Sequence, residues 1–210
     1  MEANVFNSMD YEEFVGKFGN VVERCPMIAA AVWSDRPFSS LEALENTFGD
    51  FIDSLPPSGK KGLLRCISDL AGRDMVRGTL SPESQSEQSQ GGMTTLTLAQ
   101  RSQLSELNAS YKDRFHFPFV ICARMNDTVT IIEQMTIRIH HSLERELETG
   151  IGEVKKICRL RLLDIFNQVA PAPSSNTSTG NGSRSGSQSL VFGPHPNRVN
   201  IDDFGPPCPC

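Results

Sequence analysis

Long apolar runs and an excess of basic residues are both missing from this 210-residue sequence. A helix that crosses a bilayer needs about 18 consecutive apolar residues, and none is present, so no membrane span is predicted. Lys and Arg number 20 against 25 Asp and Glu, which gives a formal net charge of -5. Phosphate binding needs a concentrated basic face, so this balance argues against nucleic acid as a partner. Residues 1–10 lack the basic start and apolar stretch of a secretory signal.

Cysteine is too scattered to suggest a metal site. Four of the six cysteines lie far apart among apolar residues, and the other two form the sequence Cys208-Pro209-Cys210. A structural zinc site needs four ligands, so this short segment does not predict one, and we expect no metal. We expect the four scattered cysteines to be packing residues of a reduced, intracellular protein rather than nucleophiles. They are Cys25, Cys66, Cys122 and Cys158.

Apolar residues at helical spacing are what residues 1–168 do contain. Phe14, Phe18, Val21 and Val22 share one helical face, and a longer apolar stripe covers 143–166. The pattern predicts an all-α fold: a single compact domain of about eight helices at residues 1–168. Its expected start signals are a cap at Ser8, Pro26 in a first turn, capping boxes at Ser39/Glu42 and Thr97/Gln100, and caps at Asp127 and Ser142.

Two segments have no clear apolar periodicity. Residues 81–95 are polar, so their composition predicts a loop or a short helix between loops. In the second segment, 12 of the 20 residues from 170 to 189 are Pro, Gly or Ser. Such a composition cannot bury enough surface to offset its ordering entropy, so residues 169–210 are predicted to be a disordered tail. Val191, Phe192, Ile201 and Phe204 leave a sticky binding peptide as the less favoured alternative.

Several further segments matter for their order and spacing together. They are Arg24-Cys25-Pro26 through Trp33, Arg36-Pro37-Phe38, 65–72, 84–88, 107–119, 153–157 and 159–161. Together they resemble the 2-oxo-4-hydroxy-4-carboxy-5-ureidoimidazoline (OHCU) decarboxylases of urate breakdown, over about residues 5–168. The resemblance implies an all-helical fold, commonly a homodimer, with no metal or organic cofactor. It also implies loss of carbon dioxide followed by protonation of one ring face to give (S)-allantoin.

The implied substrate needs no cofactor as an electron sink. Its carboxylate lies beside a carbon that is next to an imine, which can take up the electrons released with carbon dioxide. The pocket must then hold a flat polar ring, desolvate the carboxylate and deliver one proton.

The resemblance implies a binding segment and a second binding wall. The binding segment is Ser84-Gln85-Ser86-Glu87-Gln88. Glu87 is the catalytic candidate, because it can accept substrate N–H groups and repel the departing carboxylate, while Gln88 offers both a donor and an acceptor. By composition alone, a solvated polar loop would be the preferred interpretation of this segment. The second wall is the backbone of Phe119, Val120, Ile121, Cys122 and Ala123, which Pro118 frees from helical bonding.

One departure from the family pattern concerns the chemistry itself. The family's His-Pro-Asp-Leu-Ala-Gly motif reads Ile67-Ser68-Asp69-Leu70-Ala71-Gly72 here, so the proton-donor histidine is replaced by Ile67. General acid–base catalysis contributes about 10²- to 10⁴-fold, and we expect a loss of that order. Ser68 still offers a hydroxyl and an N–H to a ligand. His116, just before Phe117-Pro118-Phe119, is a candidate replacement donor, although a capping role is the more ordinary one.

Two functions therefore stay open at this point. The first is a decarboxylase with weakened turnover, and the second is a pseudoenzyme that binds a ligand or a protein partner. Vertebrate relatives in the family often end in a peroxisomal tripeptide, but this chain ends in Cys208-Pro209-Cys210, which is not such an address. A peroxisomal location rests on the resemblance alone, and a cytosolic one is the alternative.

Overall fold

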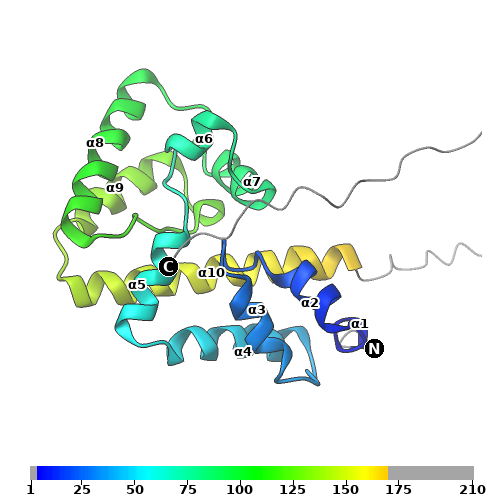
Figure 1. The fold of residues 1–210 in the computed structure, drawn as a ribbon. Coiled ribbons are helices and arrows are strands. Elements are labelled where there is room, and N and C mark those ends of the chain that lie inside the picture. Colours follow the sequence, from blue (N-terminus) through cyan, green and yellow to red (C-terminus); the bar gives the residue numbers. More distant parts are fainter. Residues whose placement is uncertain (1–3, 170–210) are drawn as a thin grey trace, which may run out of the picture. The chain divides into compact units, whose positions relative to one another are not determined.

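The computed structural model describes residues 4–169, and all of their regular secondary structure is helical (Figure 1). The all-α prediction is confirmed; the two shortest helices, α1 and α6, bring the number of α-helices to ten in this range. Val169, the first residue of the predicted tail, is the last residue of α10, and residues 170–210 lie outside the described residues. The elements are α1 (Asn4–Asn7), α2 (Tyr11–Phe18), α3 (Pro26–Trp33), α4 (Leu41–Ser54), α5 (Pro57–Cys66), α6 (Arg73–Arg77), α7 (Pro82–Gln90), α8 (Leu98–Phe115), η1 (Ala123–Met125), α9 (Thr128–Arg138) and α10 (Leu143–Val169).

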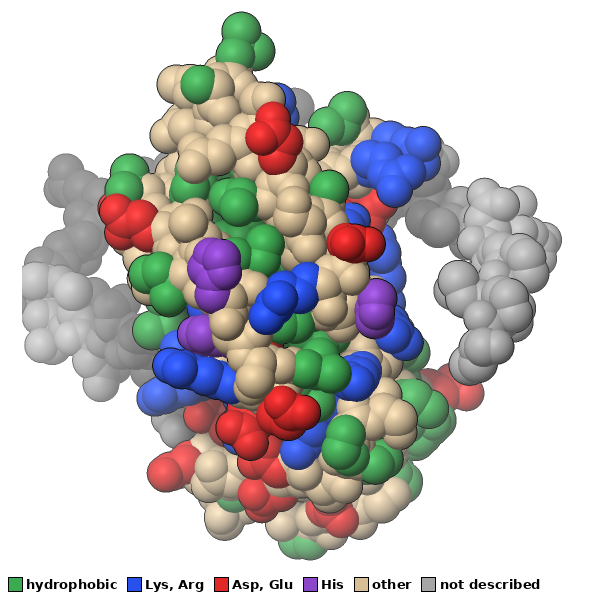
Figure 2. All heavy atoms as spheres, turned by 90° about the vertical axis from the view of Figure 1, so that its left-hand side faces the viewer, with side chains coloured by type: hydrophobic (Ala, Val, Ile, Leu, Met, Phe, Trp, Pro, Cys, Tyr) green, Lys and Arg blue, Asp and Glu red, His purple; other side chains and the backbone are tan. Residues whose placement is uncertain are grey.

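Helix α10 is the longest element, and it organises the core. Its buried apolar side chains pack against α2, α4 and α5, while α3 packs against both α2 and α4. In Figure 1, α10 crosses the fold with α4 on one side and α6–α9 on the other. None of the helices in residues 4–169 is long and apolar enough to cross a membrane. On the face drawn in Figure 2, acidic, basic and apolar side chains are interspersed.

Most of the predicted helix starts are confirmed. At α8 the Gln100 N–H donates to Thr97 Oγ1 at 3.2 Å, and the Thr97 N–H donates to Gln100 Oε1 at 3.0 Å, which completes a capping box. Pro26 is the first residue of α3, and Asp127 caps α9 by accepting from the Thr130 N–H. Ser142 accepts from the Arg145 N–H at the start of α10.

Two predicted starts are wrong. The cap of α2 is Asp10 rather than Ser8, because the Asp10 carboxylate accepts from the Glu13 N–H at 2.9 Å. The cap of α4 is Ser40 rather than Ser39, with its hydroxyl accepting from the Ala43 N–H at 3.1 Å. In both places a residue one or two positions later satisfies the free N–H groups of the first turn.

Candidate functional site

Helix α7 carries the predicted binding segment. The composition of this polar stretch is compatible with a loop or a helix, and in the structure it forms a helix. The Ser81 hydroxyl caps this helix by accepting from the Ser84 N–H. Residues three and four apart share a helix face, and Ser84, Glu87 and Gln88 have that spacing. Ser84 and Gln88 are buried, Glu87 is half-buried, and Gln85 and Ser86 lie on the exposed side.

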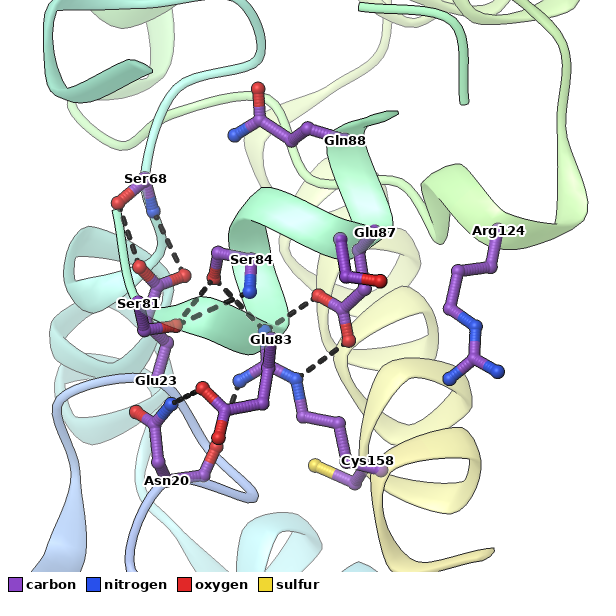
Figure 3. Close-up of polar contacts among 12 residues, drawn as sticks. Asn20, Glu23, Ser68, Ser81, Glu83, Ser84, Glu87, Gln88, Arg124 and Cys158 are labelled. Carbon is purple, nitrogen blue, oxygen red and sulfur yellow. Dashed lines mark hydrogen bonds and ion pairs between the residues drawn. The ribbon is translucent and has the colours of Figure 1, made fainter. Parts of the chain in front are cut away.

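Glu87 is held by a two-pronged ion pair with Arg161 of α10. Arg161 Nε donates to Glu87 Oε1 at 2.8 Å, and Nη2 donates to Oε2 at 2.6 Å. The guanidinium also donates to the Asn20 carbonyl and to Ser84 Oγ, at 2.8 and 3.1 Å. Figure 3 shows the residues that contact the guanidinium, Ser84 and Glu87 on α7 and Asn20 just after α2, gathered on one side of α10. The site thus contains an anchored, charge-balanced carboxylate.

The guanidinium of Arg161 is charged although its side chain is only 3% exposed. Burial on its own would lower its pKa, but the hydrogen bonds and the charge of Glu87 outweigh burial, and the pKa lies above its ordinary value. A carboxylate has about four lone-pair positions, so Glu87 keeps acceptor capacity for a ligand after binding Arg161. Its negative charge is largely neutralised, which weakens the repulsive role predicted for it.

Gln88 connects α7 to the altered motif. Its Nε2 donates to the Asp69 carbonyl at 3.2 Å, and its Oε1 accepts from the Ala71 N–H at 2.9 Å. Asn108 of α8 supports the same loop by donating to the Leu70 carbonyl at 3.0 Å. Ala71 has a φ of +48°, a left-handed conformation that costs energy for a residue with a Cβ and that these bonds maintain. The Gln88 amide is therefore a clamp on residues 69–71.

Ser68 is bound by a buried carboxylate that composition did not reveal. Ser68 Oγ donates to Glu23 Oε1 at 2.7 Å, and the Ser68 N–H reaches Glu23 Oε2 at 3.3 Å. Glu23 is 2% exposed and Ser68 6% exposed. The family's proline could supply neither donor, so this pairing is specific to the altered motif. The hydroxyl predicted to face a ligand is instead engaged by Glu23.

The predicted second wall, residues 119–123, is buried throughout. The Cys122 N–H donates to Glu153 Oε2 at 2.8 Å, so that peptide group is already paired. The Arg138 guanidinium lies 4.4 Å from the centre of the Phe119 ring, and it is fixed by the buried Glu146 carboxylate, to which Nη2 donates at 2.5 Å. These contacts hold the wall rigidly against α9 and α10.

Four of the predicted residues line cavities, two in each of two different cavities. Ser86 and Glu87 border a cavity of about 400 Å³, which is also lined by Arg161, Arg124, Lys17 and Asp164. Ile67 and Ser68 border another of about 360 Å³. His116 lines this second cavity too, so the candidate replacement donor shares a cavity with the position where the family has its histidine. Gln88 and the 69–71 loop link α7, which lines the first cavity, to the motif that lines the second.

Arg161 is the principal site residue that the sequence reasoning did not single out. It falls four residues after Ile157 and seven after Val154, so it lies on the buried face of α10. A charged residue in such a stripe signals a buried partner, because an unpaired buried charge is very costly. Glu146 and Glu153 interrupt the same face and are likewise paired.

Two of the thiols, those of Cys25 and Cys158, should react slowly. Burial, together with the neighbouring Cys66 thiol, raises the pKa of Cys25 to about 12, and burial raises that of Cys158 to about 12. At pH 8 their thiolate fraction is roughly a thousandfold below that of an ordinary thiol, so alkylation in the folded chain should slow by about that factor. Mass mapping of alkylated peptides, with the urea-unfolded chain as reference, tests this. Equal rates for the folded and unfolded chains would contradict it.

The sequence of this chain matches a known protein family. A model described as OHCU decarboxylase matches residues 7–163. The chain belongs to the OHCU decarboxylase family. Among curated members, the Mus musculus OHCU decarboxylase is 58% identical over 160 residues, covering 76% of this chain and 90% of that protein. The Xenopus laevis member is 52% identical over 166 residues, covering 79% and 95%.

Solved structures show the same fold. A crystal structure of (S)-allantoin synthase aligns with this OHCU decarboxylase family member at a TM-score of 0.63 and 21% identity, covering 78% of this chain and 53% of that one. A crystal structure of OHCU decarboxylase in the presence of (S)-allantoin aligns at 0.56 and 22%, covering 67% and 91%. Within residues 4–169, no group of three or more His, Cys, Asp and Glu residues is arranged to hold a metal ion.

Proposed function

We propose that this chain decarboxylates 2-oxo-4-hydroxy-4-carboxy-5-ureidoimidazoline to (S)-allantoin in urate breakdown, without a cofactor and at a reduced rate. The observation that carries the proposal is the fixed Glu87 carboxylate at the edge of a cavity, anchored by buried Arg161. Family membership supports it, since the curated relatives carry the name of this activity.

The proposed reaction breaks one carbon–carbon bond and forms one carbon–hydrogen bond. Carbon dioxide leaves the ring carbon, its electron pair flows into the adjacent imine, and a proton is then added to one face of the ring. Glu87 would accept N–H groups of the ring and ureido group with the lone pairs that Arg161 leaves free. Arg161 holds this carboxylate in a fixed orientation through two hydrogen bonds, which supplies positioning before the reaction begins.

The proton donor is the weak part of the site. Ile67 has no titratable group, so the proton must come from water or from another residue, and turnover should fall by about 10²- to 10⁴-fold. His116 is the candidate that lines the same cavity as Ile67. The alternative function, a catalytically inactive binding or interaction module, is favoured by the same substitution.

A stereochemical assay separates these two functions. The intermediate is generated fresh, and optical activity is followed with and without the full-length chain, because spontaneous decay gives racemic allantoin. We expect formation of an excess of (S)-allantoin, faster than the spontaneous reaction. If the chain leaves the rate and the racemic outcome unchanged, the decarboxylase proposal is wrong and the binding module stands. Calorimetric binding of (S)-allantoin then tests that second function directly.

Assembly and location are proposed on family grounds. We propose a homodimer, which sedimentation of the purified full-length chain would test against a monomer. We also propose an intracellular location, peroxisomal as in the family, with the cytosol as the alternative. Localisation of the chain tagged at its N-terminus would distinguish the two compartments.

A further inference from the structure

A cavity between α6 and α8 carries an uncompensated positive charge. It has a volume of about 730 Å³, and its lining includes the four basic residues Arg73, Arg77, Arg101 and Lys112. Asp69 is the one carboxylate among the described residues that line it, and Lys112 Nζ lies 2.6 Å from Asp69 Oδ2. That ion pair cancels one positive charge, which leaves three guanidinium groups and a formal local charge of +3. The whole chain carries -5.

The helices place these groups on two facing stripes. On α8, Arg101, Ser105, Asn108 and Lys112 follow one another at steps of three or four residues, so they share one face. On α6, Arg73 and Arg77 are four apart and share another face. The backbone of 69–72 lies between the two stripes, held to α8 by the hydrogen bond from Asn108 to the Leu70 carbonyl. The arrangement is a basic cavity between two helices with an anchored loop.

The three arginines have no anionic partner within residues 4–169. All three side chains are exposed, and none of them forms an ion pair or a side-chain hydrogen bond with another described residue. Like charges that line one cavity repel one another, so a bound anion would lower the energy of the cavity as well as its own. The charge therefore points to a ligand that carries several negative charges.

We propose that the α6–α8 cavity binds a polyphosphate anion. A guanidinium presents a planar fork of donors that matches two phosphate oxygens, and an array of arginines is typical of sites that recognise such groups. Three arginines spread over two helices suit a chain of phosphates better than a single ion. Val76 and Ala109 give the same cavity an apolar side, which could accept a nucleoside attached to the phosphate chain. Ile67, Glu87 and Arg161 take no part in it.

Titration calorimetry of the full-length chain with inorganic tripolyphosphate, at one fixed low ionic strength, tests the proposal. We expect one equivalent to bind per chain, and Arg73→Ala, Arg77→Ala and Arg101→Ala each to raise the dissociation constant by about tenfold, since each removes charge-assisted hydrogen bonds. Arg101→Lys keeps the charge but loses the fork, so it should weaken binding less than Arg101→Ala. Because the three arginines are exposed, the variants should keep the unliganded melting temperature.

Arg145→Ala is the matched control. Arg145 is exposed on α10 and lies outside the cavity lining, so this variant loses the same charge and should bind tripolyphosphate within twofold of the unaltered chain. Equal weakening by Arg145→Ala and Arg101→Ala would overturn the proposal, because binding would then follow net charge alone. Failure of the unaltered chain to bind tripolyphosphate would overturn it as well.

Comparing a nucleoside triphosphate with tripolyphosphate shows whether the site binds a nucleotide or the phosphate chain alone. A nucleoside triphosphate that binds more tightly than tripolyphosphate upholds the site and extends it over Val76 and Ala109. Equal affinities uphold it as a site for the phosphate chain alone. The test uses no decarboxylase assay, so its outcome is independent of the proposed reaction.

Discussion

Replacing Ile67 with histidine is expected to raise the rate of (S)-allantoin formation by about 10²- to 10⁴-fold, the usual contribution of a general acid. Ile67 lies at the C-terminal cap of α5 and lines a cavity with Lys112 and His116, so an imidazole at this position would have space beside it. The measurement is the initial rate of optical activity from freshly prepared intermediate, for Ile67→His and the unaltered chain. The rate should fall when pH rises past the imidazole pKa, because the donor must be protonated.

Restoring the full family motif also requires Ser68→Pro, and the structure predicts that this second substitution lowers the stability of the fold. Proline would remove both donors that Ser68 gives to the buried Glu23 carboxylate. An unpaired buried acceptor costs about 1–3 kcal/mol, and more when charged, so the double variant should be less stable than Ile67→His alone. Its activity must therefore be measured well below its melting temperature. If the fully folded double variant and Ile67→His both stay at the rate of the unaltered chain, the missing imidazole is not what limits turnover.

Two control variants distinguish a proton donor from a change of shape. Ile67→Gln adds polarity without a titratable group, so it should give no comparable gain. His116→Gly removes the candidate replacement donor at a residue with a φ of +62°, where glycine is free of strain. A residual rate that disappears in His116→Gly would assign that rate to His116. A residual rate that survives unchanged would exclude it.

The helical part of the structure could be predicted because its signals are local. Thr97/Gln100 and Asp127 act within one turn, and the apolar stripe of α10 follows a simple period. The α7 segment was ambiguous for the opposite reason. Its residues are polar on all sides, and its buried face is satisfied by Arg161 and by the 69–71 backbone, far away in the sequence. Only the tertiary partners turn that stretch into a buried helix face.

The site was predictable in part, through the family pattern rather than through local chemistry. That pattern gave Ser84, Glu87 and Gln88, but no local rule says that Gln88 clamps the altered motif or that Glu23 binds Ser68. Those pairings span up to 45 residues and depend on how α2, α5 and α7 are packed. From the sequence, the altered motif predicts a lost proton donor at Ile67 and a hydroxyl and N–H available to a ligand at Ser68. In the structure, both of these Ser68 donors bind the buried Glu23 carboxylate, a pairing that the proline of the family motif could not make.

Arg161→Ala should lower the free energy of unfolding by about 3–5 kcal/mol and abolish ligand binding at Glu87, because it leaves a largely buried carboxylate without its counter-charge. It also removes the donors to Ser84 Oγ and the Asn20 carbonyl. Urea unfolding followed by circular dichroism measures the loss. Lys155→Ala, which breaks an exposed pair with Asp53, is the matched control and should cost less than about 1 kcal/mol.

Stability and function can then be separated with a double variant. Arg161→Met combined with Glu87→Leu replaces the whole buried pair with apolar groups of similar volume, a change that is often neutral in stability. We expect this variant to unfold near the midpoint of the unaltered chain and still to bind no (S)-allantoin. If it bound the ligand normally, the pair would be structural only, and Glu87 would lose its proposed role. If Glu87 is an anchored acceptor for the substrate, its ion pair with Arg161 should add little net stability and still be required for binding.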